Sequence, residues 1–229
     1  MNIFIAHING NTAELTSEES WHCAKVLRFK SGQKINLIDG TGNFYEGVLE
    51  NVNEKKCTAA ITSGPKTRLK HPYYLHLAIA PTKNIDRMEW LVEIAVEIGI
   101  DEITFVRCKN SERTVLKDER LLKIAESAVK QSLQAYIPKI NGLISFEDLI
   151  QSSADLKFIA HCETDSKKSL KDFELKNRKS LVLIGPEGDF SHEEINLAKT
   201  KGFSAITLGE NRLRTETAGL YVVNAFALL

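Results

Sequence analysis

Two short apolar runs that each stop at a glycine organise the C-terminal half of the chain. Leu181–Ile184 is followed at once by Gly185, and Ala205–Leu208 is followed by Gly209. Branched apolar runs of this length, bounded by glycine or proline, predict buried strands. The polar residues after each run then lie at the carboxyl end of a strand.

A helix start follows each of these turns. The segment Ser191–Glu194 has the S-x-x-E spacing of a capping box, and Thr215-Glu216 opens the last apolar segment. A strand, a tight turn and a helix N-terminus place free N–H groups where open α/β sheets bind ligands. One such turn is typical of any tight connection, but two turns joined by one helix predict a shared site.

The pattern before these runs alternates between strands and helices, which predicts a parallel sheet. The expected strands are Tyr74–Ala80, Ile103–Val106 and Lys157–His161, and the expected helices are Asp86–Ile98, ended by Gly99, and Lys117–Leu133. The Lys-rich segment Thr164–Ser180 has little apolar content and predicts a surface excursion.

The first 70 residues favour strands instead. Alternation and a Gly-rich turn predict strands at Lys34–Gly40, Phe44–Leu49 and Cys57–Ile61, and one helix is expected between Glu18 and Lys30, with Trp21, Ala24, Val26 and Leu27 as its apolar positions. Ser63–Pro72 contains Gly-Pro, four basic residues and a second proline, which predicts a linker. We therefore expect a small β domain over residues 1–70 and an α/β domain over 71–229.

Composition excludes several classes of protein. The 30 basic and 30 acidic residues cancel, so any attraction for RNA must come from a local basic patch. The four cysteines, at 23, 57, 108 and 162, contain no C-x-x-C pair, and neither a metal nor a redox role is expected. No apolar stretch predicts a membrane span, and Met1–Phe4 has no signal-peptide pattern, so a cytoplasmic location is expected.

The last helix is apolar in nearly every direction. Ala218–Leu229 contains two polar side chains, Tyr221 and Asn224. A helix of this kind must be buried all round, either in a core or in a subunit interface.

These segments together resemble one family. Leu183–Ile195, LIGPEGDFSHEEI, and Leu208–Gly219, LGENRLRTETAG, are similar to the two signature loops of the RsmE family of SPOUT methyltransferases. His22–Arg28 resembles that family's N-terminal H-x-x-x-V-L-R, Met88–Gly99 its first C-terminal helix, and Ser111–Arg113 its S-E-R. The matches cover nearly the whole chain in the right order.

The resemblance implies a fold and an activity. It implies a PUA-like β-barrel followed by a SPOUT-like α/β domain with a parallel sheet and a trefoil knot, assembled as a homodimer. It further implies methylation of N3 of a uridine in 16S ribosomal RNA of the small subunit, with S-adenosyl-L-methionine as the methyl donor and no metal. An alternative is a non-catalytic RNA-binding or ribosome-assembly factor that retains the fold.

The resemblance also assigns candidate residues. The cofactor is expected at apolar and small residues of the two loops, namely Leu183, Ile184, Gly185, Glu187, Gly188, Leu208, Gly209, Leu213 and Thr215. Arg214 is the candidate catalytic cation, and Lys25, Arg28 and Arg113 are candidates for RNA binding. Glu187 is either a cofactor ligand or an acceptor at a helix start, and Thr215 and Glu216 are alternatively helix caps.

The chain departs from the family pattern at three positions. Asp189 replaces a common glycine, so that backbone position is either less open or has no need of a positive φ. Asn211 replaces a common arginine and Arg212 an apolar residue, so the basic group is shifted by one. A nucleotide-phosphate enzyme is a weaker alternative, because neither G-x-x-x-x-G-K-[ST] nor G-x-G-x-x-G is present at Gly185–Ser191.

Overall fold

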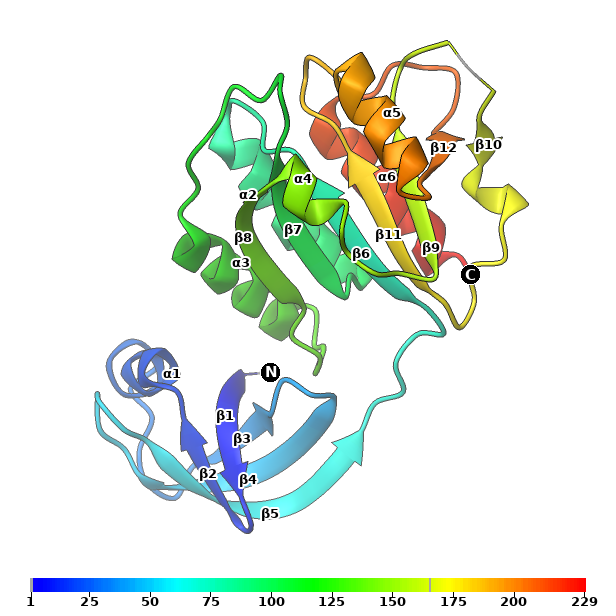
Figure 1. The fold of residues 1–229 in the computed structure, drawn as a ribbon. Helices are drawn as coiled ribbons and strands as arrows, with labels where there is room; N and C mark the ends of the chain where they lie inside the picture. The colour runs from blue at the N-terminus through cyan, green and yellow to red at the C-terminus, as the bar shows by residue number, and fades with distance from the viewer. Residues whose placement is uncertain (1, 165) are drawn as a thin grey trace. The chain divides into compact units, whose positions relative to one another are not determined.

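The computed structural model describes residues 2–164 and 166–229 as two compact units (Figure 1). The first unit is Met1–Lys70 with Val129–Ile137, and the second is His71–Ala128 with Pro138–Leu229. Met1, the first residue of the expected β domain, and Asp165, within the expected surface excursion, lie outside the described residues.

The first unit is built on a closed five-stranded barrel, as expected. The barrel order is β1-β2-β5-β4-β3, with β1 at Ile3–Asn9, β2 at Thr12–Leu15, β3 at Lys34–Ile38, β4 at Asn43–Asn51 and β5 at Thr58–Thr67. Neighbouring strands are antiparallel except for β1 and β3, whose parallel pairing closes the barrel. Phe4, Leu37 and Leu49 fill its interior.

The expected linker is shorter than predicted. Ser63–Thr67 belongs to β5 and pairs with β4, so Gly64-Pro65 lies inside the strand. The pairing shifts register on either side of Glu46, and a proline is tolerated at such an irregularity because it has no N–H to donate. The residues from Arg68 to Tyr73 form no regular element.

The barrel helix also differs from the prediction. It is a short α1 at Ser17–Trp21 that continues as a π-helix, η1, at His22–Val26, and it ends before Lys30. The wider i→i+5 turn changes which side chains face inward. Glu19, Ser20 and Cys23 are buried, whereas Trp21 and Val26, which we expected to be core positions, are 52% and 50% exposed.

The second unit contains a seven-stranded parallel sheet, as predicted. Its order is β10-β12-β9-β11-β6-β7-β8, with β6 at Tyr74–Ile79, β7 at Glu102–Arg107, β8 at Lys139–Ser145, β9 at Leu156–Ala160, β10 at Lys168–Ser169, β11 at Lys179–Ile184 and β12 at Ser204–Thr207. The strands after β6 first extend the sheet on one side and then on the other. This reversal is the point at which open α/β sheets bind ligands.

Helices cover both faces of this sheet (Figure 1). Figure 1 shows α2 (Ile85–Ile98) and α6 (Thr215–Ala227) on one face and α4 (Phe146–Leu149) and α5 (His192–Thr200) on the other, and α3 spans Asp118–Gln131. The capping box at Ser191 and Glu194 and the left-handed C-cap at Gly99 are confirmed. Phe146 and Ile195 pack on Leu181 in one buried cluster.

Two segments behave differently from the patterns that predicted them. The expected surface excursion contains β10 and a 3-10 turn, η2, at Leu170–Asp172, and Leu170 and Leu175 are buried. The last helix buries one side against the sheet, but Tyr221 is 47% exposed. No helix in the described ranges 2–164 and 166–229 is long and apolar enough to cross a membrane. The strand order does not test the trefoil knot, which stays a prediction.

A buried polar cluster lies at the start of β6 and β7. The His76 ring nitrogen Nε2 lies 2.7 Å from Thr104 Oγ1, and Glu102 accepts hydrogen bonds from Tyr74 at 2.9 Å and Asn141 at 2.8 Å. Burial lowers the pKa of His76 to about 4 and outweighs the opposite effect of Glu102. Burial alone would raise the pKa of Glu102, but His76 and the two hydrogen bonds lower it overall.

This cluster predicts a loss of stability in acid. Unfolded His76 takes up a proton near pH 6.5, whereas folded His76 stays neutral until about pH 4, so the free energy of unfolding should fall across that window. The slope should approach about 1.4 kcal/mol per pH unit for one proton. Glu102, whose folded pKa is lowered, adds a loss at still lower pH. Urea unfolding from pH 7.5 to 4 should show the slope in the wild type and a shallower one in His76→Gln; equal slopes would contradict this assignment.

Candidate cofactor cavity

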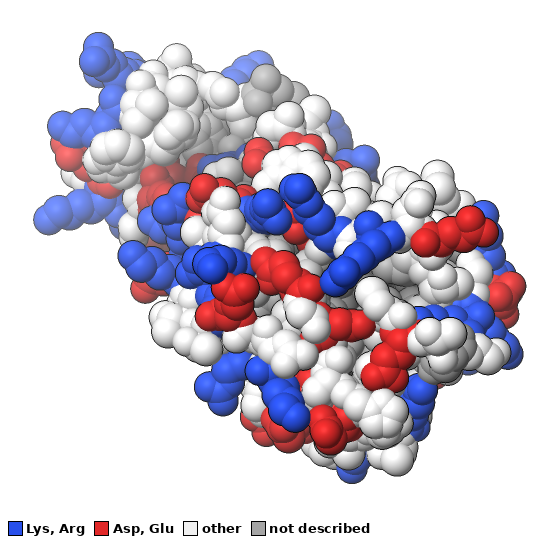
Figure 2. Space-filling model, turned by 90° about the horizontal axis from the view of Figure 1, so that it is seen from above, with Lys and Arg blue, Asp and Glu red and all other residues white. Residues whose placement is uncertain are grey.

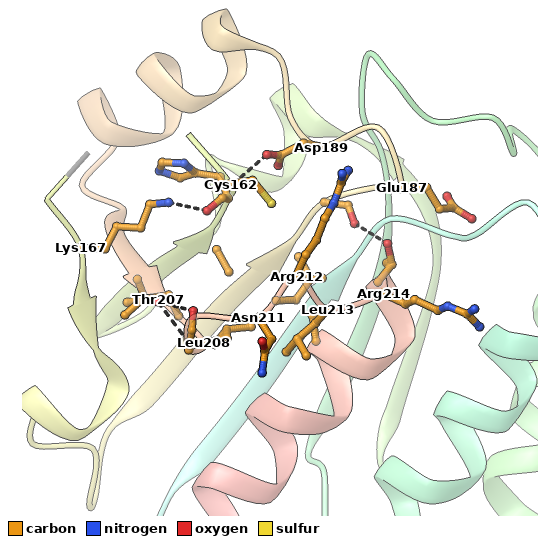
Figure 3. Close-up of a pocket in the computed structure, with 18 of the residues that line it drawn as sticks. Cys162, Lys167, Glu187, Asp189, Thr207, Leu208, Asn211, Arg212, Leu213 and Arg214 are labelled. Carbon is orange, nitrogen blue, oxygen red and sulfur yellow. Dashed lines mark hydrogen bonds between the residues drawn. The ribbon is translucent and has the colours of Figure 1, made fainter. Parts of the chain in front are cut away.

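A cavity of about 690 Å³ opens at the carboxyl ends of β9, β11 and β12 (Figure 3). Its walls are the loops that follow these three strands and the first turn of α6. The apolar surface comes from side chains on all of these elements, namely Ala160, Ile184, Ile206, Leu208, Leu213 and Ala218. A cavity of this size, mostly apolar with a few polar groups, is typical of small-molecule sites.

One hydrogen bond joins the two signature loops. Thr215 Oγ1, in the first turn of α6, donates to the carbonyl of Gly185 at 3.1 Å, and both groups are buried. The predicted capping role of Thr215 and Glu216 is wrong, because Arg214 is the N-cap residue and no side chain caps this helix. The Glu216 carboxylate oxygen Oε1 instead lies 3.5 Å from Nη1 of Arg87 in α2.

The glycines of the first loop make room for neighbouring protein atoms. A Cβ atom at Gly185 would lie 2.9 Å from the Phe190 ring, and one at Gly188 would lie 3.3 Å from the Asn110 Cβ. Gly188 is also outside the cavity wall. The absence of a side chain at Gly188 lets the neighbouring segment pack on the loop, and a cofactor contact at Gly188 stays a prediction.

Asp189 does occupy a left-handed backbone conformation. Its φ is +62°, so the position needs the conformation that glycine adopts most easily. Its carboxylate accepts hydrogen bonds from the Cys162 N–H at 2.7 Å and its neighbour Phe190 N–H at 2.8 Å. Asp189 thus ties the loop after β11 to the loop after β9, which lies between β11 and β12 in the sheet.

A segment that the sequence motifs only touched holds the first loop from outside. Asn110 donates to the carbonyls of Gly188 at 3.3 Å and Asp189 at 3.1 Å, and the Lys109 N–H donates to Glu194 at 2.8 Å. Arg113, of the S-E-R motif, donates to the carbonyls of Thr82 and Lys83. Its guanidinium therefore holds the loop after β6, and its role in RNA binding stays a prediction.

Most of the predicted cofactor residues meet in the cavity wall. These are Ile184, Gly185, Glu187, Leu208, Gly209, Leu213 and Thr215. Leu183 is instead fully buried in the core between the sheet and α5. Glu187 accepts a hydrogen bond from the Lys83 N–H at 3.1 Å, while Ser191 and Glu194 form the reciprocal cap of α5. Glu187 is thus not the acceptor at that helix start.

The two arginines of the second loop take different directions. In Figure 3 the Arg212 side chain extends toward the first loop, between Asp189 and Glu187, whereas the side chain of Arg214, which also belongs to the cavity wall, extends toward α2. The resemblance gave Arg214 as the candidate catalytic cation, whereas Arg212 departs from the family pattern. Figure 2 shows that Lys and Arg side chains on the viewed face are interspersed with Asp and Glu rather than gathered into one patch.

The candidate RNA residues of the barrel are exposed. Lys25 forms an ion pair with Glu54 at 2.8 Å. Arg28 follows the π-helix with φ +55°, and it forms no ion pair or side-chain hydrogen bond within the part of the chain that the structure describes. A non-glycine residue in this conformation is uncommon, and such strain is often found at functional positions.

The cavity offers no activated thiol. Burial and the Asp189 carboxylate raise the pKa of the Cys162 thiol, so this side chain stays protonated at neutral pH. Cys162 lies just after β9 in the cavity wall. Among residues 2–164 and 166–229, no three His, Cys, Asp or Glu side chains are grouped so as to hold a metal ion.

A five-stranded barrel and a parallel α/β unit with a cavity at the carboxyl ends of its strands define the class of protein. Residues 69–227 match the sequence model described as RNA methyltransferase domain, and residues 15–62 match the RNA methyltransferase PUA domain. The chain therefore belongs to the RNA methyltransferase family that these two domains define, and its barrel is PUA-like.

Similar proteins support a narrower relationship. Ribosomal RNA small subunit methyltransferase E of Bacillus subtilis is 25% identical, with 94% of this chain and 90% of that protein covered. A probable rRNA-methyltransferase from Porphyromonas gingivalis is 38% identical, with a TM-score of 0.88 and coverage of 100% and 98%. Ribosomal RNA small subunit methyltransferase E from Neisseria gonorrhoeae, solved with S-adenosyl methionine bound, is 26% identical, with a TM-score of 0.84 and coverage of 100% and 97%. The resemblance to the RsmE family is confirmed.

The hydrogen bond between the two loops predicts a selective loss of stability. Thr215→Val keeps the shape of the side chain but leaves the buried Gly185 carbonyl without its donor, which should cost about 1–3 kcal/mol. Thr207→Val is the matched control, because the Thr207 hydroxyl bonds only to the exposed turn at Gly209. Urea unfolding should separate the two variants; equal losses would mean that the buried bond has no special weight.

Proposed function

We propose that this protein transfers a methyl group from S-adenosyl-L-methionine to N3 of a uridine in 16S ribosomal RNA of the small ribosomal subunit, in the cytoplasm. The observation that carries the proposal is the cavity formed by the two family signature loops at the carboxyl ends of β9, β11 and β12. The relative from Neisseria gonorrhoeae, which has the same fold, binds S-adenosyl methionine.

The cavity wall suits the cofactor. A flat adenine needs apolar surfaces on both sides and backbone groups at its edge, and Leu208, Leu213 and Ile206 supply the apolar surface. Glu187 supplies a carboxylate at the wall for the positively charged end of the cofactor. Leu183 and Gly188 act behind the wall, through the core and through Asn110.

The chemistry requires position and charge rather than a metal. The N3 proton of uracil must leave, and the methyl carbon must lie in line between the cofactor sulfur and N3. Holding two reactants in this arrangement is worth about 7–11 kcal/mol of barrier. A nearby cation stabilises the negative charge that spreads to the ring oxygens. Arg214 remains our candidate for this catalytic role, and it requires that its side chain turn toward the cavity when RNA binds.

The two units divide the work in this proposal. The α/β unit carries the chemistry, and the barrel holds phosphates through Arg28 and Lys25. Phosphate contacts orient a protein on RNA without reading its sequence. Arg28 is exposed and unpaired among described residues, whereas Lys25 must first leave Glu54. The boundary near residue 70 is part of this proposal.

A homodimer completes the proposed assembly. Helices α2 and α6 pack together, and their outward sides carry Trp90, 49% exposed, and Tyr221, 47% exposed. Leu228, at the end of the same helix, is also exposed. Large apolar side chains on the outward sides of neighbouring helices are typical of a protein interface.

The activity should be visible on RNA from cells that lack the gene. Incubation of their small subunits with the protein and S-adenosyl-L-methionine should produce N3-methyluridine, detected by mass spectrometry of 16S rRNA. Leu208→Trp should fill the apolar wall, weaken cofactor binding at least tenfold in calorimetry and abolish the product. Leu197→Trp, on the exposed side of α5, is the control and should behave as wild type. A wild-type protein that binds RNA, but does not bind the cofactor and does not form the product, would favour the assembly-factor alternative.

The dimer should depend on the exposed side of α6. Sedimentation equilibrium of the wild type at micromolar concentration should give twice the chain mass of 25.7 kDa. Tyr221→Glu places a charge on the proposed interface and should give the single-chain mass, because burying an unpaired carboxylate is costly. Leu197→Glu, on α5, should stay dimeric. A monomeric wild type rejects this part of the proposal.

A further inference from the structure

The backbone around Arg212 is fixed on both sides. Before it, Thr207 Oγ1 bonds to the N–H and carbonyl of Gly209, which has φ +117°. After it, Thr215 Oγ1 bonds to Gly185 across the cavity. Arg212 therefore leaves a held loop, and Figure 3 shows its side chain at the rim, reaching toward the gap between Asp189 and Glu187.

The Arg212 guanidinium has no partner within the described part of the chain. It is exposed, and it forms neither an ion pair nor a hydrogen bond there. The nearby carboxylates are engaged elsewhere: Asp189 accepts from the N–H groups of Cys162 and Phe190, and Glu187 accepts from the Lys83 N–H. A planar group with five donors and no protein acceptor is suited to an oxygen anion.

The other polar side chains at the rim do not offer an unpaired cation that faces this gap. Lys167 Nζ donates to the carbonyl of His161 at 2.5 Å. The Arg214 side chain, although part of the cavity wall, extends toward α2 in Figure 3, and the Asn211 side chain points away from the first loop. Among the wall residues that the structure describes, Arg212 is thus the cation that faces the gap.

We propose that Arg212 binds an anionic oxygen of the RNA substrate at the rim of the cavity. This oxygen belongs to a phosphate beside the target nucleotide or to the uracil ring as N3 loses its proton. The exposed position favours a ligand that arrives from solvent over the cofactor, which occupies the apolar wall. With zero net charge on the chain, such local cations must supply the attraction for RNA. The inference rests on the proposed function.

The test compares the removal of this cation with its displacement. Arg212→Gln removes the charge, and the double variant Asn211→Arg with Arg212→Asn moves it by one residue while the composition stays the same. Methyl transfer is measured with small subunits as varied substrate at several salt concentrations, cofactor affinity by calorimetry, and RNA affinity by filter binding. Both variants should lose at least about tenfold in kcat/KM for RNA, with cofactor affinity within twofold of wild type.

The two sources of the anion give different patterns. If Arg212 contacts a phosphate, loss of the arginine should raise KM, leave kcat unchanged and reduce the salt slope of RNA binding by about one. If Arg212 contacts the uracil oxygen, loss of the arginine should lower kcat at saturating RNA. Unchanged kinetics, a displaced arginine that works as well as the original, or a loss confined to cofactor affinity would each overturn the proposal. If the wild type transfers no methyl group, the proposed function fails, and RNA binding still decides whether Arg212 contacts RNA.

Discussion

The hydrogen bond from Thr215 to the Gly185 carbonyl connects elements that the sheet itself keeps apart. Strands β11 and β12 are not neighbours, because β9 lies between them. The cavity therefore depends on side chains that join three loops. Thr215 ties the segment after β12 to the loop after β11, and Asp189 ties the loop after β11 to Cys162 in the loop after β9. The Thr215 bond ends on a buried backbone carbonyl, which cannot find water as a substitute, whereas the Asp189 bond to the Cys162 N–H is exposed. The parallel sheet brings the loops to one edge, and these two side chains fix the space between them.

The parts of this arrangement that local sequence determines could be predicted. The capping box at Ser191 and Glu194, the glycine cap at Gly99 and the strands around Gly185 each depend on residues within a few positions. The packing of Asn110 against Gly188 could not, because the two are 78 residues apart and neither residue type specifies the other. The same holds for Asp189: only the structure shows that its positive φ is retained and that its carboxylate binds another loop.

The prediction of which helix side chains face inward was wrong where the backbone departed from the regular 3.6-residue period. In the π-helix that follows Trp21 the buried residue is Cys23, while Val26, an apolar position expected from a 3.6-residue period, is exposed; Glu19 is buried in the α-helical turn before it. Glu19 is retained inside because Lys130 pairs with it. In α6 the period is regular, and Tyr221 on its outward side is not buried by this chain's own core, so burial in a subunit interface stays a prediction. A hydrophobic pattern shows which side chains a segment can bury, but it does not identify the surface that covers them.

Two lysines near the first loop already have acidic partners. Near the first loop Lys83 pairs with Glu112 at 2.9 Å and Lys109 with Glu193 at 3.2 Å, with every partner more than half exposed. Exposed pairs of this kind contribute about 0–1 kcal/mol, so a phosphate can replace the carboxylate at little cost. The replacement gains less than binding to a free cation would, which weakens attraction to arbitrary RNA. Affinity must then come from contacts that depend on geometry, and an arginine held at the rim of the cavity is worth most when the correct nucleotide enters.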